Sequence, residues 1–207
     1  MIILDCIQGT PEWVEARLGI PTSSEFSKII TPAKGDYSSQ AVTYQHKLIA
    51  ERLTGKEATG FMSDWMERGK EMEAEARSWY EFTQGVTVQQ VGFVYQDERK
   101  LFGCSPDGLL ENKGWECKCP SPGVMVSYML DGGLPREYIP QVQGSMFITG
   151  YESWDFTVYH PDFDPILITV KRDDEFIAKL EKHLGRFNKE LHEKLKRLGY
   201  AEEETTA

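Results

Sequence analysis

Residues 103–119 read GCSPDGLLENKGWECKC, and the rest of the chain is organised around this stretch. Residues 111–114 are Glu-Asn-Lys-Gly, and because Asn and Gly are typical of tight turns, the stretch predicts two short antiparallel strands joined by a hairpin. Side chains alternate along a strand, which places Glu116 and Lys118 on one face. We therefore expect Asp107, on the first strand, to lie across from Glu116, so that two carboxylates and an amine meet at one point.

This grouping suits metal-assisted hydrolysis of a phosphodiester. Two carboxylates supply the hard oxygen ligands that Mg²⁺ and Mn²⁺ prefer, and the backbone carbonyl of Cys117 is well placed as a further ligand. A bound metal acidifies a water molecule and neutralises charge on the phosphate, while Lys118 orients that water or stabilises the developing charge. The plain alternative is a surface hairpin with an ordinary Glu-Lys pair, because this spacing also arises often by chance.

The same residues resemble the PD-(D/E)XK nuclease signature, with Pro106-Asp107 as its first half and Glu116-Cys117-Lys118 as its second. Five blocks in chain order, within a match that runs from about residue 8 to residue 199, resemble the phage lambda exonuclease family, the YqaJ-type viral recombinases. These blocks are residues 12–25, 68–73, 104–109, 116–120 and 141–146. Five blocks in register are far more specific than the central motif alone.

The resemblance implies a fold and an activity. The fold is α/β, with a restriction-endonuclease-like core in which a mixed central β-sheet is flanked by α-helices. The activity is a Mg²⁺-dependent 5′→3′ exonuclease, with Mn²⁺ as the alternative metal, that degrades one strand of double-stranded DNA to mononucleotides. The 3′ overhangs that remain serve homologous recombination. The resemblance further implies a toroidal homotrimer with DNA in its channel, a single-strand annealing protein as partner, and a phage or prophage protein in the bacterial cytoplasm.

The resemblance also assigns the catalytic residues. Asp107, Glu116 and the carbonyl of Cys117 would hold the metal together with Glu73, and Lys118 would assist the attacking water. Taken without the resemblance, Glu73 is one of several acids on a helix face that is normally solvated surface.

A further set of residues is implied in binding DNA. A 5′-phosphate pocket would consist of Arg17, Ser24, Ser105 and Gln141. Lys34 would be a basic loop residue that contacts DNA, and Met66 would be an apolar wedge that helps to split the terminal base pair. Each also has an ordinary structural interpretation, such as a helix N-cap for Ser24, a solvated lysine and a core methionine. Pro140 departs from the family pattern and is expected to shift the start of the helix that carries Gln141.

Composition and charge bound the possibilities. The chain has 207 residues and a formal net charge of −10, and we expect a single exonuclease domain over residues 1–200 followed by a polar tail over 201–207. A simple DNA-binding protein is expected to be basic, so charge alone argues against nucleic acid. The resemblance offers a resolution, in which a positive channel is surrounded by an acidic outer wall. No apolar stretch is long enough to cross a membrane, which favours a cytoplasmic protein.

The four cysteines, at positions 6, 104, 117 and 119, admit two interpretations. A single Cys-x-Cys, without a second pair or grouped histidines, is a weak signal for zinc or for an iron–sulfur cluster. Small, reduced, buried thiols are the interpretation we adopt.

The remaining pattern predicts an alternation of helices and strands. Helices are expected over residues 13–18, 25–30, 40–53, 64–82, 124–130 and 136–149, and strands over 86–95, 154–160 and 166–170. A last helix carries one apolar seam, which we expect to pack within the domain and which consists of Phe176, Leu180, Leu184, Phe187, Leu191, Leu195 and Leu198.

Two other functions are compatible with this sequence. A non-processive endonuclease acting on branched or circular DNA would use the same carboxylate site, since that site serves many nucleases. A non-catalytic partner of a strand-annealing protein would instead retain a vestigial nuclease fold, and the intact Asp107, Glu116 and Lys118 argue against it.

Overall fold

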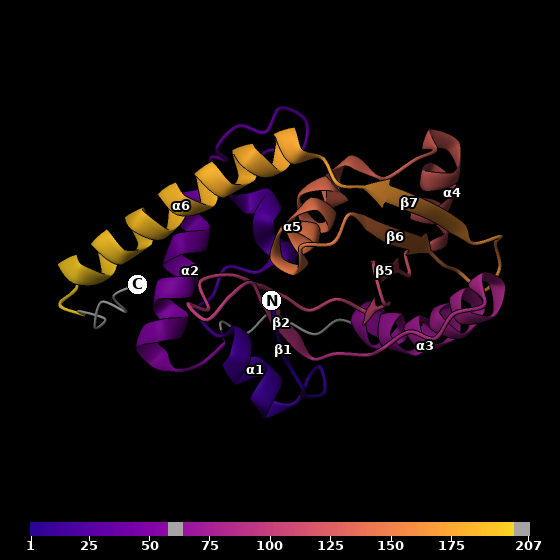
Figure 1. Ribbon diagram of the computed structural model, residues 1–207, viewed down its shortest axis with the longest axis horizontal. Coiled ribbons are helices and arrows are strands. Elements are labelled where there is room, and N and C mark those ends of the chain that lie inside the picture. The colour runs from indigo at the N-terminus through magenta and orange to yellow at the C-terminus, as the bar shows by residue number, and fades with distance from the viewer. Residues whose placement is uncertain (58–63, 201–207) are drawn as a thin grey trace.

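A computed structural model describes residues 1–57 and 64–200, with side chains described over 1–57 and 72–200 (Figure 1). The strands are β1 (Ile2–Leu4), β2 (Phe93–Tyr95), β3 (Gly103–Cys104), β4 (Gly108–Leu109), β5 (Gly114–Lys118), β6 (Ser153–Val158) and β7 (Ile166–Lys171). The α-helices are α1 (Pro11–Arg17), α2 (Ala41–Thr54), α3 (Asp64–Gln84), α4 (Pro122–Asp131), α5 (Ile139–Thr149) and α6 (Asp174–Arg197), and the 3₁₀ helices are η1 (Ser23–Lys28) and η2 (Arg136–Tyr138). The expected polar tail, 201–207, lies outside the described residues.

The strands form a three-stranded sheet in the order β1-β2-β3 and a four-stranded sheet in the order β4-β5-β6-β7. In the second sheet β4 and β5 are antiparallel, β5 and β6 are parallel, and β6 and β7 are antiparallel. Parallel neighbours need a long crossover, which α4, η2 and α5 supply between β5 and β6. The expected α/β fold, with a mixed sheet flanked by helices, is therefore confirmed.

Alternation along β5 sends its side chains to two different helices. Trp115 and Cys117 face α3, where they form an apolar cluster with Ala76 and Tyr80. Glu116, between them, faces α5. Figure 1 shows α3 below this sheet and α5 to its left. One strand thus separates an apolar face from the face that carries the acidic motif.

The apolar seam of α6 packs within the domain, as predicted. Its side chains from Phe176 to Leu195 are buried in the main core with residues of α2 and α5. Leu198 is an exception, because the helix ends at Arg197 and this side chain is 56% exposed. None of the helices in the described ranges is both long and apolar enough to cross a membrane.

Two expected elements take a different form. The helix expected over 25–30 is the 3₁₀ helix η1, and its N-cap is Thr22, without a side-chain capping bond. The prediction that Ser24 is a helix N-cap is therefore wrong. A helix that holds only six residues and buries Phe26 completely is shaped by packing against the core, which outweighs the local capping signal.

The strand expected over 86–95 is divided between the two sheets. Only its end, β2, pairs with β1, while Gln89 forms an isolated bridge with Leu109 of the hairpin. Gly92 lies at the change of direction, where an added Cβ would lie 2.2 Å from the carbonyl oxygen of Cys6. The close approach of the N-terminal segment breaks the strand, and the alternating pattern carries no sign of it.

The sequence predicts an apolar face of α2 made of Val42, Leu48, Ile49 and Leu53, and the structure confirms it in part. Leu48 and Ile49 are buried, but Val42 is 47% exposed. Ala41 and Tyr44 are buried in its place because positions 41, 44 and 48 are spaced by three and four residues and so lie on one face of the helix.

Candidate active site

The hairpin forms as predicted and brings the two acidic residues together. Gly108 pairs with Trp115, and the same register places Asp107 across from Glu116, just before β4 begins. The Oδ2 atom of Asp107 accepts a hydrogen bond of 2.7 Å from the backbone N–H of Cys117. Gly108 permits this arrangement because a Cβ there would lie 1.9 Å from Val88 Cγ1.

Glu116 is the most buried member of the site, with 2% of its surface exposed. Its Oε1 atom accepts hydrogen bonds from Lys118 Nζ at 2.5 Å and from Gln141 Nε2 at 2.6 Å. The ammonium group of Lys118 also lies 5.4 Å from the centre of the Tyr138 ring. The acidic motif, the lysine and a helix amide are thus gathered on the α5 face of the sheet.

The charges in this cluster are not balanced. Burial, the charge of Glu116 and the charge of Glu73 together raise the pKa of Asp107 well above its usual value, against the opposing effect of Lys118. Burial disfavours the charged amine of Lys118, but Glu116 and Asp107 outweigh it and raise its pKa. Lys118 is therefore a cation at neutral pH, and a second positive charge would relieve the remaining repulsion among the carboxylates.

The donor atoms suit a hard divalent cation. Within the described residues, no three His, Cys, Asp or Glu side chains are grouped as a ready-made metal cage. For such a cation the protein would supply Asp107, Glu116 and the Cys117 carbonyl, with Glu73 nearby and water completing the coordination. Mg²⁺ is commonly bound in this way, through one or two carboxylates and several waters, so the residues fit such an ion.

An open cleft of about 510 Å³ lies beside Glu73 and Asp107 and has the size of a small-molecule site. Gln8, Trp13, Glu73, Arg77 and Asp107 are among the residues that line it. Glu73 and Asp107, which come from α3 and from the hairpin, therefore face the same space.

Gln8 is a site residue that no sequence pattern indicates. Its Nε2 atom donates to the carbonyl oxygen of Pro106 at 2.9 Å and to that of Val91 at 3.1 Å. The N-terminal segment thereby holds the loop immediately before Asp107. The contact to Pro106 spans 98 positions of the chain, and a lone glutamine gives no local signal for it.

Comparison with known proteins assigns the chain to a family. The model of the YqaJ-like viral recombinase domain matches residues 12–152. The chain belongs to the YqaJ-like viral recombinase family. A search of curated proteins finds no match.

Three solved structures with this fold are of exonucleases. The YqaJ-like chain is similar to LHK-Exo, an alkaline exonuclease from Laribacter hongkongensis, at 32% identity and a TM-score of 0.82, over 92% of this chain and 96% of that one. The structure of LHK-Exo in complex with dAMP gives a TM-score of 0.83 at 32% identity, over 91% and 96%. A phage-related exonuclease from Haemophilus somnus 129PT, at 15% identity and a TM-score of 0.62 over 86% and 96%, shares the fold.

The expected phosphate-pocket residues of this YqaJ-like domain fall into separate contacts. Trp13 Nε1 donates to Ser105 Oγ at 2.9 Å, and the guanidinium carbon of Arg17 lies 4.2 Å from the centre of the Trp13 ring. Ser24 is exposed, and its hydroxyl lies 3.2 Å from that of Thr22. Trp13 therefore connects Arg17 to Ser105, whereas Gln141 is bonded to Glu116. The role of all four in phosphate binding stays a prediction.

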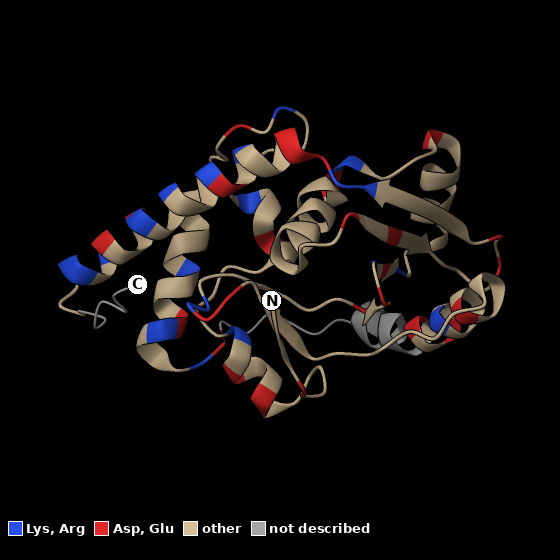
Figure 2. Cartoon of the chain, in the orientation of Figure 1, with Lys and Arg blue, Asp and Glu red and all other residues tan. Residues whose placement is uncertain are grey.

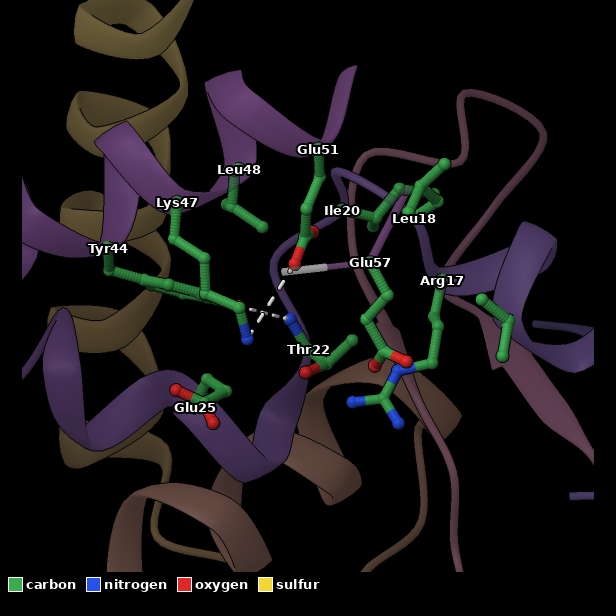
Figure 3. Close-up of a pocket in the computed structure, with 11 residues that line it drawn as sticks. Arg17, Leu18, Ile20, Thr22, Glu25, Tyr44, Lys47, Leu48, Glu51 and Glu57 are labelled. Atoms are coloured by element: carbon green, nitrogen blue, oxygen red, sulfur yellow. Dashed lines mark hydrogen bonds and ion pairs between the residues drawn. The ribbon is translucent and has the colours of Figure 1, made fainter. Parts of the chain in front are cut away.

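Arg17 borders a small pocket of mixed charge between α1 and α2 (Figure 3). Figure 3 shows Arg17 and Glu57 directed toward the same space. Glu51 accepts a hydrogen bond of 3.1 Å from the backbone N–H of Gly19 and lies 3.7 Å from Lys47 Nζ. The pocket holds only about 10 Å³, room for about one water, so a phosphate would need this group of residues to open.

Two further residues, Lys34 and Met66, are predicted to contact DNA. Lys34 is exposed in the loop after η1, and its contact with DNA stays a prediction. Met66 lies outside the residues whose side chains are described. Figure 2 shows Lys and Arg spaced along α6, on the opposite side of the view from the hairpin.

All four cysteines are free thiols, as predicted. Cys104 and Cys117 are buried, while Cys6 and Cys119 are half-buried. The sulfur atoms of Cys117 and Cys119 lie 3.9 Å apart. Cys104 and Cys117 pack in two apolar clusters as small side chains, and Cys119 packs against the second of them.

Proposed function

We propose that this YqaJ-like protein is a Mg²⁺-dependent 5′→3′ exonuclease that degrades one strand of double-stranded DNA to mononucleotides. The 3′ single-strand overhangs that remain would serve phage-type recombination. The observation that carries the proposal is the pairing of Asp107 with Glu116 and Lys118 at one end of β5. It occurs in a member of a recombinase family whose solved neighbours include an alkaline exonuclease.

The side chains have distinct roles in this proposal. Asp107, Glu116 and the carbonyl of Cys117 would hold the cation, with Glu73 as a further carboxylate. When bound, a divalent cation lowers the pKa of a coordinated water and offsets charge on the phosphate. In the metal-free protein the charges of Glu116 and Asp107 raise the pKa of Lys118, so this side chain would attract a phosphate or water oxygen as a positive charge. Gln141 holds Glu116 Oε1 in place.

A digestion assay tests this proposal. With Mg²⁺ and linear duplex DNA, we expect mononucleotides released from the 5′ ends and growing 3′ single strands, and no reaction in excess chelator. The expected phosphate pocket predicts faster digestion of 5′-phosphate ends than of 5′-hydroxyl ends. Equal rates on the two ends would reject that pocket, and digestion from 3′ ends would reject the proposed polarity.

The two alternatives give different results in the same assay. Nicking or cutting of closed circular DNA would favour an endonuclease. Undiminished digestion by Lys118→Ala would favour a non-catalytic partner whose nuclease site is vestigial. We expect the circle to remain intact and the variant to be inactive.

The proposed assembly is a homotrimeric ring around DNA in the bacterial cytoplasm, with a single-strand annealing protein as partner. A ring offers a channel in which basic side chains of three copies are close to the phosphates, although one chain has a net charge of −10. Sedimentation with and without duplex DNA measures the number of chains. A monomer under both conditions would contradict the ring.

A further inference from the structure

The proposed metal ligands come from two separate elements. Asp107, Glu116 and the Cys117 carbonyl belong to the β4-β5 hairpin, whereas Glu73 belongs to α3. For all of them to reach one ion, the helix must be fixed relative to the hairpin. A link between these two elements is therefore part of the site.

Asp155 of β6 provides such a link on the α3 face of the sheet. It is 1% exposed, and its Oδ2 atom accepts hydrogen bonds from Tyr80 Oη at 2.6 Å and from Lys113 Nζ at 2.5 Å. Tyr80 belongs to α3, and Lys113 lies in the hairpin turn between β4 and β5. Its Oδ1 atom accepts a third bond from Thr169 of β7 at 2.7 Å. One buried carboxylate thus joins the helix, the hairpin and the sheet.

Because Glu73 and Tyr80 belong to the same helix, fixing Tyr80 also fixes the position of Glu73. Glu73, Ala76 and Tyr80 are spaced by three and four residues, which places them on one face of α3. Ala76 and Tyr80 are fully buried, and the Tyr80 ring stacks on Trp115, next to Glu116, with ring centres 5.3 Å apart. Glu73 is two turns away on the same face and lines the cleft that Asp107 also lines.

We infer that Asp155 is a positioning residue for the nuclease site, because it holds Tyr80 of α3 and Lys113 of the hairpin on one carboxylate and so fixes Glu73 relative to Asp107 and Glu116. The inference rests on the proposed function. In this inference the site requires the Asp155 link in addition to the acidic motif. The link lies on the opposite face of the sheet from Glu116.

Mn²⁺ binding to the DNA-free protein, measured by calorimetry, tests the inference. Tyr80→Phe removes one hydroxyl and keeps the ring stacked on Trp115, and we expect it to weaken Mn²⁺ binding about 10-fold. Tyr37→Phe is the matched control, because Tyr37 donates to the carboxylate of Glu190 at 2.9 Å in a similar cluster with Arg186 and Gln45. That cluster joins α2 and α6 and contains none of the proposed metal ligands, so the affinity of the control should equal that of the wild type.

A double-mutant cycle separates positioning from general loss of stability. If Tyr80 acts through Glu73, then Tyr80→Phe has no further effect on Mn²⁺ affinity once Glu73→Gln is present. Independent effects that multiply, or a Tyr80→Phe variant with wild-type affinity, would overturn the inference while leaving the proposed function intact. A wild-type protein that binds no Mn²⁺ would overturn both.

A second variant, Lys113→Gln, tests the same inference if Tyr80→Phe does not fold. Lys113→Gln cuts the same link on the hairpin side and leaves α3 unchanged. We expect the same weakening of Mn²⁺ binding and the same lack of a further effect in the Glu73→Gln background. Wild-type affinity in folded Lys113→Gln would overturn the inference.

Discussion

Two buried carboxylate–lysine pairs lie on adjacent strands of one sheet, and they differ in how completely their charge is compensated. Glu116 and Lys118 lie on the α5 face, and Asp155 and Lys113 on the α3 face, each pair at 2.5 Å. Burial opposes the ionised form of Asp155, but bonds from Lys113, Tyr80 and Thr169 outweigh it and lower the pKa. In the other cluster the pKa of Asp107 is raised.

The difference distinguishes a structural ion pair from a candidate metal site. Asp155 has three donors from three elements, so its charge is stabilised within the fold itself. Glu116 shares its lysine with Asp107, and Glu73 adds a further negative charge nearby. Buried charges are stable only when they are paired or bound to a metal, and in the second group Glu116 and Asp107 share the charge of one lysine, Lys118.

The largest expected effect is on catalysis. Glu116→Gln should lower the rate of DNA digestion by at least about 10³-fold, because one proposed metal ligand is lost. Asp155→Asn should retain far more activity, since its side chain touches neither the cleft nor the acidic motif. Both rates are measured on 5′-phosphorylated linear duplex with saturating Mg²⁺. Equal losses in the two variants would remove the functional distinction between the clusters.

For stability we expect the opposite order, with the larger loss in the Asp155 variant and the smaller loss in the Glu116 variant. Asp155→Ala leaves Lys113 and Tyr80 without their shared acceptor and should lower the free energy of unfolding by about 3 kcal/mol in metal-free protein. Glu116→Gln removes one of several mutually repelling carboxylates and should have a smaller effect in the same urea titration. A Glu116→Gln variant that is the less stable of the two would show that its cluster is a structural pair.

The smallest expected effect is the pH dependence of stability without metal. Asp155 has a lowered folded pKa, so its contribution is present above the unfolded value of about 3.9 and is lost as pH falls through the folded pKa. Asp107 has a raised folded pKa, so the fold gains stability as pH falls through it toward the unfolded value. Asp107→Asn should abolish the gain in stability that Asp107 causes at falling pH and keep the loss that Asp155 causes. Urea unfolding across pH in chelator measures both, and identical profiles for Asp107→Asn and wild type would contradict the assignment.

The sequence predicts a feature of this fold well when the residues that form it are close together in the chain. The hairpin and the meeting of Asp107 with Glu116 follow from turn residues and strand alternation within 17 residues. The Asp155 cluster was not predicted, because Tyr80 and Lys113 are 75 and 42 positions away from it. A tyrosine in a helix and a lysine in a turn each have an ordinary local interpretation.

The structure gives Gln141 a contact that the resemblance does not specify. Its amide donates to Glu116, and its assigned role at the 5′ phosphate stays a prediction. Pro140 lies in the first turn of α5, which begins at Ile139, directly after η2. The helix start sets the direction of the amide, and no motif specifies that contact without the packing of α5 on β5.

The most direct test of the central claim is the effect of Mg²⁺ on the unfolding of the DNA-free protein at pH 8. A ligand that binds only the folded state raises the free energy of unfolding. At concentrations above its dissociation constant, the rise grows with the logarithm of the ligand concentration. We predict this rise for the wild type and for Tyr37→Phe, and no rise for Asp107→Asn. A wild-type protein whose stability does not respond to Mg²⁺, or an equal rise in Asp107→Asn, would contradict a cation site at the end of β5.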